Sequence, residues 1–179
     1  MQMPYILKTA PTKNNLRHAS FGYSSSMKLT DYTDYTLRAL IYLGLNSDRL
    51  VTIQQIAESY GISRNHLMKI VNQLSQDGIV HAVRGRNGGL ELAVDPAKIN
   101  MGRVVRSAEQ DFRLVECFEG ATNQCVLSPA CRLQHSLRRA LEAFFRVLDD
   151  VSLADLIENA NEIRQLVPGL AETRAPTRK

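Results

Sequence analysis

The three cysteines of the chain lie within one 15-residue segment and are the residues best suited to chemistry. Cys117, Cys125 and Cys131 are separated by seven and five residues. An odd number of clustered thiols favours a metal or redox role over a disulfide framework, and purely structural cysteines would be scattered through the core. The spacing exceeds the roughly two to four residues between paired zinc ligands, but it suits a loop wrapped around an iron–sulfur cluster.

Iron–sulfur clusters usually take four protein ligands, so three cysteines leave one position to another residue. His135 is a candidate for that position, and a structural zinc ion held by the cysteines with His135 is a second hypothesis. A cysteine-dependent enzyme is a third, and it lacks support because no Cys-His-acid arrangement, phosphate loop or dinucleotide fingerprint is present. We therefore expect a protein that is not an enzyme.

The size of the chain limits what these cysteines can belong to. With 179 residues, 44% of them hydrophobic, it can form one compact core or a small domain with a dimerisation extension, which excludes a large multi-domain enzyme. The net charge of +4 is only mildly basic. Much of the excess falls between Gly61 and Leu90, where four basic residues face one acid, so this stretch is the expected phosphate-facing surface.

Helical spacing of apolar residues predicts a first helix over residues 33–45. Thr52, with Gln55 three residues later, predicts a capping box that starts a second helix, and Gly61 ends that helix. Ser63 is expected to cap a third helix. Two short helices joined by a glycine-containing turn form the helix–turn–helix pattern. The side chains of the third helix expected in the core are Leu67, Ile70, Val71 and Leu74.

The opposite face of the third helix is polar and suits DNA reading, because Asn, Lys and Arg side chains donate to purine edges in the major groove. A hairpin over residues 79–94 follows, and arginines at its glycine-rich tip, residues 85–89, suit a narrow minor groove. The competing interpretation of the helix face is an ordinary solvated surface. The hairpin favours DNA binding, because a plain structural hairpin would not need two arginines at its tip. The residues predicted to contact double-stranded promoter DNA are Ser63, Arg64, Asn65, His66, Lys69, Arg84, Arg86 and Gly88.

The second half of the chain is expected to carry the cysteines and a dimer contact. A short helix over residues 101–108 precedes a loop over residues 110–128 that holds two of the cysteines. The Ser-Pro pair at 128–129 predicts the start of a long helix that runs to Leu148, on the order of 30 Å in length. Its heptad-like apolar seam is longer than a small wing domain needs, which predicts a homodimer.

The two ends of the chain carry weaker signals. Ser152 is expected to cap a last helix that Pro168 ends. The polar, acid-free residues 1–26 are expected to be disordered, either as a misassigned start before Met27 or as a natural arm that reaches for DNA. Their apolar run at 4–7 is too short for a signal peptide, and no segment approaches the roughly 20 apolar residues of a membrane span. We therefore expect a cytoplasmic protein without a membrane partner.

Three ordered motifs give a more specific indication. Together they resemble the Rrf2 family of winged-helix iron–sulfur regulators, and within it the cysteine loop is similar to that of nitric-oxide-sensitive repressors. The likeness spans about residues 27–167, and the ordered combination is more specific than any one motif. The motifs are Met27–Tyr35 in the first helix, Gly85–Gly89 in the wing, and the cysteine triplet with its neighbours in Glu116–Phe118, Asn123–Cys125 and Pro129–Cys131.

The resemblance implies that all three cysteines ligate an iron–sulfur cluster, for which we favour 4Fe-4S over 2Fe-2S. It also implies a fourth ligand from the first helix of the partner subunit, at the position of Asp34, where the helix dipole alone would also explain an acid. A related cluster-assembly regulator has a histidine three residues after its last cysteine. Here Gln134 occupies that position and His135 follows it, so His135 is expected to be an ordinary polar residue.

These observations predict a mainly α fold with a small β-hairpin wing. The cluster-loaded dimer is expected to bind promoter half-sites about 34 Å apart and to block transcription. Nitric oxide is expected to react with the iron and lower the affinity for DNA, which would release nitrosative-stress genes from repression. The alternative is a winged-helix regulator that senses iron–sulfur or redox status. The expected divisions are 1–26, an extension; 27–96, the winged helix–turn–helix; 97–132, the linking helix and cluster loop; 129–167, the dimerisation helices; and 168–179, a disordered tail.

Overall fold

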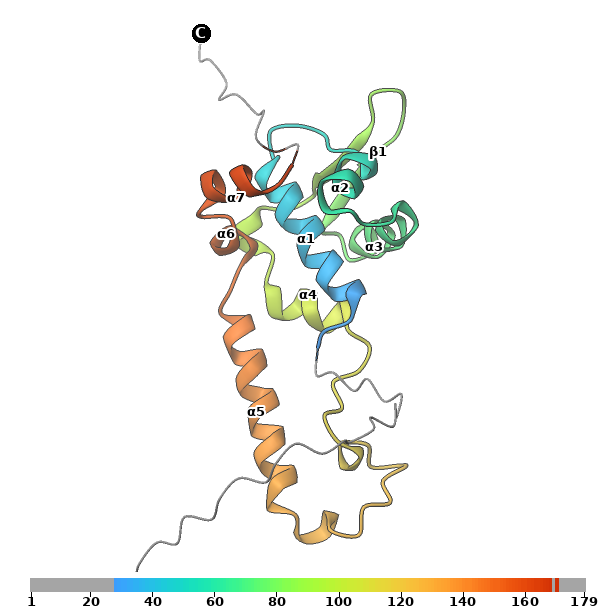
Figure 1. Cartoon of the computed structure of the whole chain (residues 1–179), viewed down its shortest axis with the longest axis vertical. Helices are drawn as coiled ribbons and strands as arrows, with labels where there is room; N and C mark the ends of the chain where they lie inside the picture. Colours follow the sequence, from blue (N-terminus) through green and yellow to red (C-terminus); the bar gives the residue numbers. More distant parts are fainter. Residues whose placement is uncertain (1–27, 169, 171–179) are drawn as a thin grey trace, which may run out of the picture.

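A winged-helix head and a long separate helix make up the computed structural model, which describes residues 28–168 and residue 170 (Figure 1). In Figure 1 the head lies at the top, and helix α5 runs down from it to the loop that holds the cysteines. The predictions for residues 1–26 and for residues 171–179 lie outside the described residues.

Capping side chains start the helices of the head. Helix α1 (Asp31–Leu45) begins where the Thr30 side chain accepts a hydrogen bond from the Thr33 amide. Helix α2 (Ile53–Tyr60) begins with the predicted capping box, and Gly61 ends it with φ +64°, a conformation that favours glycine. The contacts of α2 confirm its predicted capping box and terminal glycine, whereas α1 covers the predicted residues 33–45 and starts two residues earlier, at a cap that was not predicted.

The recognition helix packs its apolar face into the head. Helix α3 (Arg64–Gln76) starts at Ser63, whose side chain accepts from the His66 amide at 3.3 Å. Its four predicted core side chains are buried, and they join a core that includes Leu40 and Val104. Burying such a side chain contributes about 1.5–3 kcal/mol, so this core fixes which face of α3 remains outside.

The wing is an antiparallel hairpin of two four-residue strands. Strand β1 (Val80–Val83) pairs with β2 (Gly89–Leu92), with Val80 opposite Leu92 and Val83 opposite Gly89. Val51 forms an isolated β-bridge to β2, because its amide and carbonyl both bond to Leu90, at 3.0 and 2.7 Å. The sequence patterns did not predict this bridge, which fastens the wing to the segment before α2.

Helix α4 (Met101–Ala108) packs against both α1 and helix α5 (Arg132–Asp149). Arg106 forms two hydrogen bonds to the Asp149 carboxylate, at 2.5 and 2.8 Å, and its guanidinium lies 4.1 Å from the Phe145 ring centroid. A Cβ atom at Gly102 would lie 2.0 Å from Asp149 Oδ1, so only glycine permits this close approach. These contacts fasten the C-terminal end of α5 to α4.

Two helix boundaries differ from the predictions. The Ser-Pro pair starts only a 3₁₀ turn, η3 (Ser128–Ala130), and α5 begins at Arg132 because the Cys131 side chain caps it. The predicted last helix is divided into α6 (Leu153–Leu156) and α7 (Ala160–Leu166).

The division of the last helix has a packing cause. Ile157 packs against α1 at Gly44, where a Cβ atom would lie only 3.2 Å from Ile157 Cδ1. Asn159, a residue type that competes with helix hydrogen bonds, is then the N-cap of α7. Within the described part of the chain, no helix is long and apolar enough to cross a membrane.

Candidate nucleic-acid interface and candidate metal centre

The exposed face of α3 carries the polar side chains predicted to read DNA. Its core residues hold the helix so that the polar side chains of its first turn are exposed. Gln73 is half-buried and donates a 2.9 Å hydrogen bond to Asp77, so it lies at the border of this face. The side chains that the structure places on the exposed surface are Ser63, Arg64, Asn65, His66, Met68 and Lys69.

The wing places two further cations beside this helix. Arg84 and Arg86 are exposed near the tip of the hairpin, which projects beyond the rest of the head (Figure 1). Gly85 has φ +116°, and the Gly88 amide donates to its carbonyl at 3.0 Å. A Cβ at Gly88 would lie 2.2 Å from the Val83 carbonyl oxygen, so glycine is required for this tight turn.

One aromatic contact of the DNA-facing side was not predicted. The Tyr35 ring of α1 lies 6.1 Å from the His66 ring of α3, centroid to centroid. Arg38 also contacts Tyr35, with its guanidinium 6.0 Å from the Tyr35 ring centroid. The first turn of the recognition helix is therefore held against α1. The head is a winged-helix DNA-binding domain.

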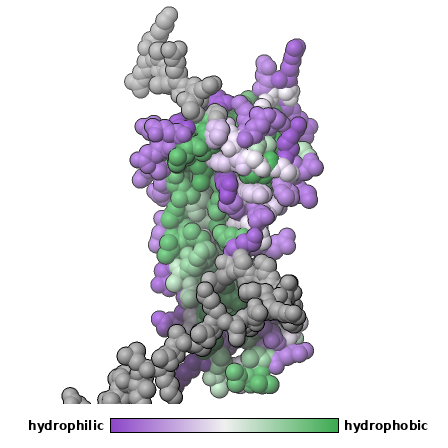
Figure 2. Space-filling view, in the orientation of Figure 1, coloured by the Kyte–Doolittle hydropathy of each residue, from purple (hydrophilic) through white to green (hydrophobic). Residues whose placement is uncertain are grey.

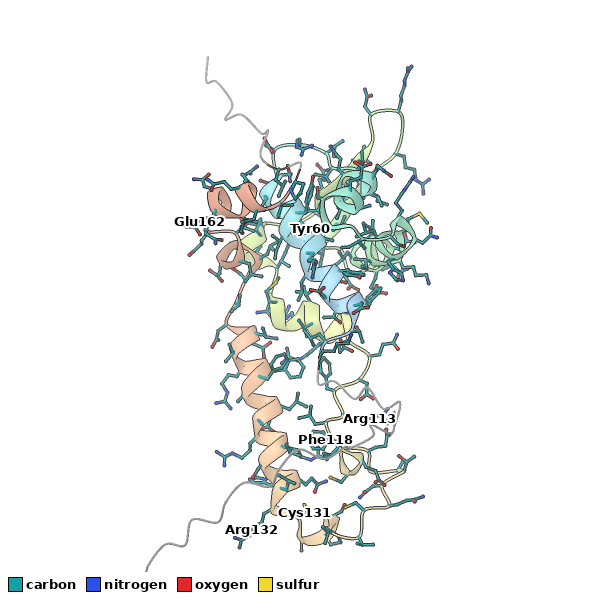
Figure 3. All side chains as sticks on the ribbon, in the orientation of Figure 1. Tyr60, Arg113, Phe118, Cys131, Arg132 and Glu162 are labelled. Carbon is teal, nitrogen blue, oxygen red and sulfur yellow. The ribbon has the colours of Figure 1, made fainter. Side chains whose placement is uncertain are left out.

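The three cysteine side chains share one loop at the far end of α5. All three are free thiols of intermediate exposure, within the cysteine loop, residues 110–131. Cys117 lies in the 3₁₀ turn η2 (Glu116–Phe118), Cys125 precedes η3, and Cys131 caps α5. Figure 3 shows Cys131 at the lower end of α5 and Phe118 farther up beside the same helix.

Gln134 contacts two of the cysteine residues at once. Its backbone amide donates to Cys131 Sγ at 3.4 Å, as expected at a helix N-cap. Its side-chain Nε2 donates to the Cys117 carbonyl oxygen at 2.6 Å. One turn later, the Arg138 guanidinium lies 4.8 Å from the Phe118 ring centroid. The first two turns of α5 thus hold η2 in place.

The middle cysteine is positioned by polar neighbours in the loop. The Cys125 amide donates to Asn123 Oδ1 at 3.0 Å, and Asn123 Nδ2 donates to Ser128 Oγ at 2.8 Å. The amide of Gln124 donates to Glu116 Oε1 at 2.7 Å. The contact between Gln124 and Glu116 ties the residue before Cys125 to the segment that carries Cys117.

The start of the cysteine loop is held by an ion pair and an aromatic contact. Arg113 bonds to both carboxylate oxygens of Asp111, which keeps the pKa of Asp111 below its ordinary value, and Arg113 also pairs with Glu119. The Phe112 ring meets the Phe145 ring edge to face, with centroids 4.7 Å apart. These contacts direct the chain from the head toward α5.

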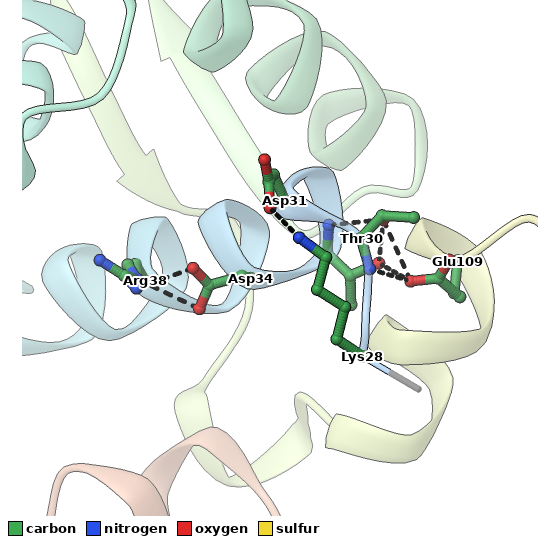
Figure 4. Close-up of polar contacts among 7 residues, drawn as sticks. Lys28, Thr30, Asp31, Asp34, Arg38 and Glu109 are labelled. Atoms are coloured by element: carbon green, nitrogen blue, oxygen red, sulfur yellow. Dashed lines mark hydrogen bonds and ion pairs between the residues drawn. The ribbon is translucent and has the colours of Figure 1, made fainter. Parts of the chain in front are cut away.

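The two candidate fourth ligands lie elsewhere. Asp34 is on α1, where its carboxylate pairs with Arg38 of the same helix at 2.7 Å and its side chain is 44% exposed (Figure 4). His135 is exposed on α5. Within residues 28–168, no three Cys, His, Asp or Glu side chains converge on a point suited to one metal ion.

A buried carboxylate connects the loop to α1. Glu109, which caps the C-terminus of α4, is 9% exposed, and its Oε2 accepts hydrogen bonds from Thr30 N, Thr30 Oγ1 and Thr33 Oγ1 at 2.9, 3.0 and 2.7 Å (Figure 4). The first turn of α1 is thereby anchored at the residue before the cysteine loop.

The comparisons with known proteins give this architecture a family. The Rrf2 family, described as iron-dependent transcriptional regulators, matches residues 29–159, and the chain belongs to this family. It is 54% identical over 142 residues to the HTH-type transcriptional regulator NsrR of Bacillus licheniformis and 51% identical to that of Bacillus subtilis. These matches cover 79% of this chain and 99% and 97% of the two relatives.

Solved structures of the same type confirm the winged-helix fold. The structure of T. potens IscR superposes with a TM-score of 0.62 and 25% identity, covering 76% of this chain and 90% of that one. The oxidized form of Staphylococcus aureus CymR superposes with a TM-score of 0.60 and 26% identity, covering 74% and 97%. The predicted fold, the predicted family and the predicted DNA-binding transcription repressor are confirmed.

Several side chains of the site were missed by the sequence patterns. Asn123 had a usable signal, because the side-chain oxygen of an Asn in a turn often accepts a hydrogen bond from the backbone amide two residues later, here that of Cys125. Gln134 follows Cys131 at the spacing of a capping box, which predicts a local bond, yet its side chain bonds to Cys117 instead. Glu109 had no signal, because its partners lie 76 and 79 residues away.

Proposed function

We propose that this regulator is a homodimer whose affinity for promoter DNA falls when nitric oxide reacts with an iron–sulfur cluster held by Cys117, Cys125 and Cys131. The observation that carries the proposal is the grouping of three free, partly exposed cysteines in one loop. Three free thiols lie in one loop, and each cysteine residue is fixed by a hydrogen bond to its Sγ, its amide or its carbonyl.

The donor set fits such a cluster. Thiolates are its usual ligands, and the intermediate exposure of all three cysteines leaves them reachable. The Cys131 sulfur sits at the N-terminus of an 18-residue helix, where a negative charge is favoured. When bound, the cluster would supply iron that reacts with nitric oxide. We favour 4Fe-4S over 2Fe-2S, and the three cysteines leave one position open in either.

The carboxylate of Asp34 is our proposal for the remaining position, contributed by the partner subunit. Its side chain is 44% exposed, so it can be reached from outside its own chain. Its ion pair with Arg38 is also exposed, and such a pair contributes less than about 1 kcal/mol, so a better partner can replace it. An oxygen ligand is weaker for iron than a thiolate, which would make this position the reactive one.

Helix α5 is the proposed dimer contact. None of its 18 residues is buried within one chain, and Leu133, Phe144 and Val147 are 63%, 41% and 65% exposed. A groove of about 560 Å³ between α5 and residues 109–114 adds a further apolar surface. Hydrophobic side chains are visible along the upper half of α5 and the helices above it (Figure 2). A second copy would cover this surface.

DNA binding is proposed to use the exposed face of α3 for bases and the wing arginines for the minor groove. Dimerisation would set two recognition helices at half-sites about 34 Å apart or a multiple of that distance. A rearrangement of the cysteine loop reaches α1 through Glu109, and α1 contacts α3 through Tyr35 and His66. We propose the cytoplasm as the place of action, because three reduced thiols persist there.

Anaerobic purification followed by iron and sulfide analysis, native mass spectrometry and promoter gel shifts tests this function. The wild-type protein is expected to contain iron and sulfide, to absorb in the visible and to release DNA as nitric oxide is added. Cys125→Ser should lose the visible absorption, whereas the control variant Ser136→Ala, which changes an exposed residue of α5 that is not a proposed ligand, should keep it. A colourless zinc protein, or binding that persists after complete reaction with nitric oxide, would contradict the proposal.

A further inference from the structure

The cysteine loop is held to α5 by a residue that has no place in the ligand set. Gln134 lies in the first turn of α5 and is half-buried. Its two nitrogens donate to two different cysteines. The backbone amide donates to Cys131 Sγ at 3.4 Å, and the side-chain Nε2 donates to the Cys117 carbonyl oxygen at 2.6 Å. These cysteines are 14 residues apart in the sequence, so nothing in the local backbone fixes their separation.

We propose that Gln134 is a positioning residue that sets the Cys117 segment against Cys131 before any cluster is bound. This inference rests on the proposed iron–sulfur function of the cysteines and assigns the residue that prepares their geometry. The side chain does not itself reach a reacting atom. It acts through the Cys117 carbonyl, and so through the backbone that carries the first thiol.

The contacts around this bond show why one side chain can have this effect. The turn η2 has two backbone hydrogen bonds of its own, from Phe118 N to the Val115 carbonyl and from Glu119 N to the Glu116 carbonyl. Such a short turn is weak alone, because its hydrogen bonds have poor geometry. Gln134 adds the bond that fastens it to an 18-residue helix, and Arg138 covers the Phe118 ring from the same face.

A donor is required at this position. The Cys117 carbonyl oxygen can only accept, and a carboxamide offers N–H groups at the correct reach. Gln134→Glu keeps the shape of the side chain but places an acceptor against an acceptor at neutral pH. Gln134→Ala removes the contact and leaves the helix intact, because alanine has the highest helix propensity. The pair of variants therefore separates loss of the donor from loss of the side chain.

The first arm of the test uses the full-length protein without metal. Hydrogen exchange of the amides of residues 116–119 is expected to be about five to ten times faster in both variants than in the wild type, as a lost hydrogen bond predicts. Exchange in the winged-helix head should be unchanged. Gln165→Glu, an exposed position on α7, is the control for the added charge. Wild-type exchange in both Gln134 variants would overturn the proposal.

The second arm uses anaerobically reconstituted protein. Both variants are expected to release iron to a chelator about tenfold faster than the wild type, in the range found when a partner of a metal ligand is removed. Their visible circular dichroism should also differ from that of the wild type, a signature that a general loss of stability would not produce. Unchanged release and unchanged spectra would overturn the role of Gln134. A wild-type protein without iron and sulfide would instead overturn the cluster, and the exchange arm would still decide the anchor.

Discussion

The hydroxyl of Thr33 donates a 2.7 Å hydrogen bond to the carboxylate of Glu109, a buried contact between residues 76 positions apart. Thr33 belongs to the first turn of α1, and Glu109 is the last residue before the cysteine loop. Asp34 is the next residue of α1. The proposed ligand of the partner's cluster and the start of this chain's own cysteine loop are therefore joined through one carboxylate.

Thr33→Val tests the energy of that contact. Valine keeps the shape of the side chain but cannot donate, so the free energy of unfolding should fall by about 1.5–3 kcal/mol, the range for a hydrogen bond to a charged group. Urea unfolding at a fixed protein concentration measures the change. Thr122→Val, an exposed threonine of the loop, should stay within about 0.5 kcal/mol of the wild type. Equal stability of the two variants would show that the contact contributes nothing.

The ion pair between Arg106 of α4 and Asp149 of α5 predicts that the stability of the fold depends on pH. The hydrogen bonds from Arg106 hold the pKa of Asp149 below its ordinary value. A carboxyl whose folded pKa is lowered stabilises the fold above its unfolded pKa, about 3.9, and loses that contribution as the pH falls through the folded value. The melting temperature of the wild type should therefore fall more between about pH 5 and about pH 3 than that of Asp149→Asn. Asp150→Asn, the exposed neighbour, should follow the wild type.

The wing predicts a specific loss of DNA affinity. Arg86→Ala should weaken promoter binding by about tenfold and should lower the salt dependence by about one counterion, because it removes a cation from the tip of the hairpin. Fluorescence anisotropy at several salt concentrations measures both quantities. Arg139→Ala removes the same charge from α5, far from the wing in Figure 1, and should leave the slope unchanged. The wing has no role in binding if the two variants behave alike.

Asp34 can be tested separately from protein stability. Its ion pair with Arg38 is exposed, so Asp34→Asn should change the free energy of unfolding of the metal-free protein by no more than about 0.5 kcal/mol. The reconstituted variant should lose iron to a chelator faster than the wild type. Asp31→Asn changes a 70% exposed carboxylate of the same helical turn and should have neither effect. Equal iron retention in both variants would remove Asp34 from the ligand set.

Local chemistry predicted most of the head correctly. The capping box at Thr52, the glycine at the end of α2 and the alternation around Leu90 each depend on neighbours a few residues away, which the sequence displays directly. The helix break at Ile157 could not be predicted in this way. It depends on the flat surface at Gly44, which only the packed structure brings next to it.

The cysteine site was predicted by type but not by geometry. Clustering of three thiols in one segment identified the loop, whereas the bond from Gln134 to Cys117 depends on how 17 residues fold back on α5. The capping role of Cys131 likewise displaced the predicted start of that helix by several residues, because a thiol took the place expected for Ser128. Long-range polar contacts of this kind have no periodic signature.

Both ends of the segment from the cysteine loop through α5 are attached to the same eight-residue helix. Glu109 caps α4 where the segment leaves the head, and Arg106 of α4 holds Asp149 where it returns. The segment therefore leaves the head and returns to it at the same helix, α4. A sensing module cut from this protein for grafting onto another DNA-binding head would have to bring α4 with it, and a glycine at position 102 would leave the Asp149 carboxylate in its place beside Arg106.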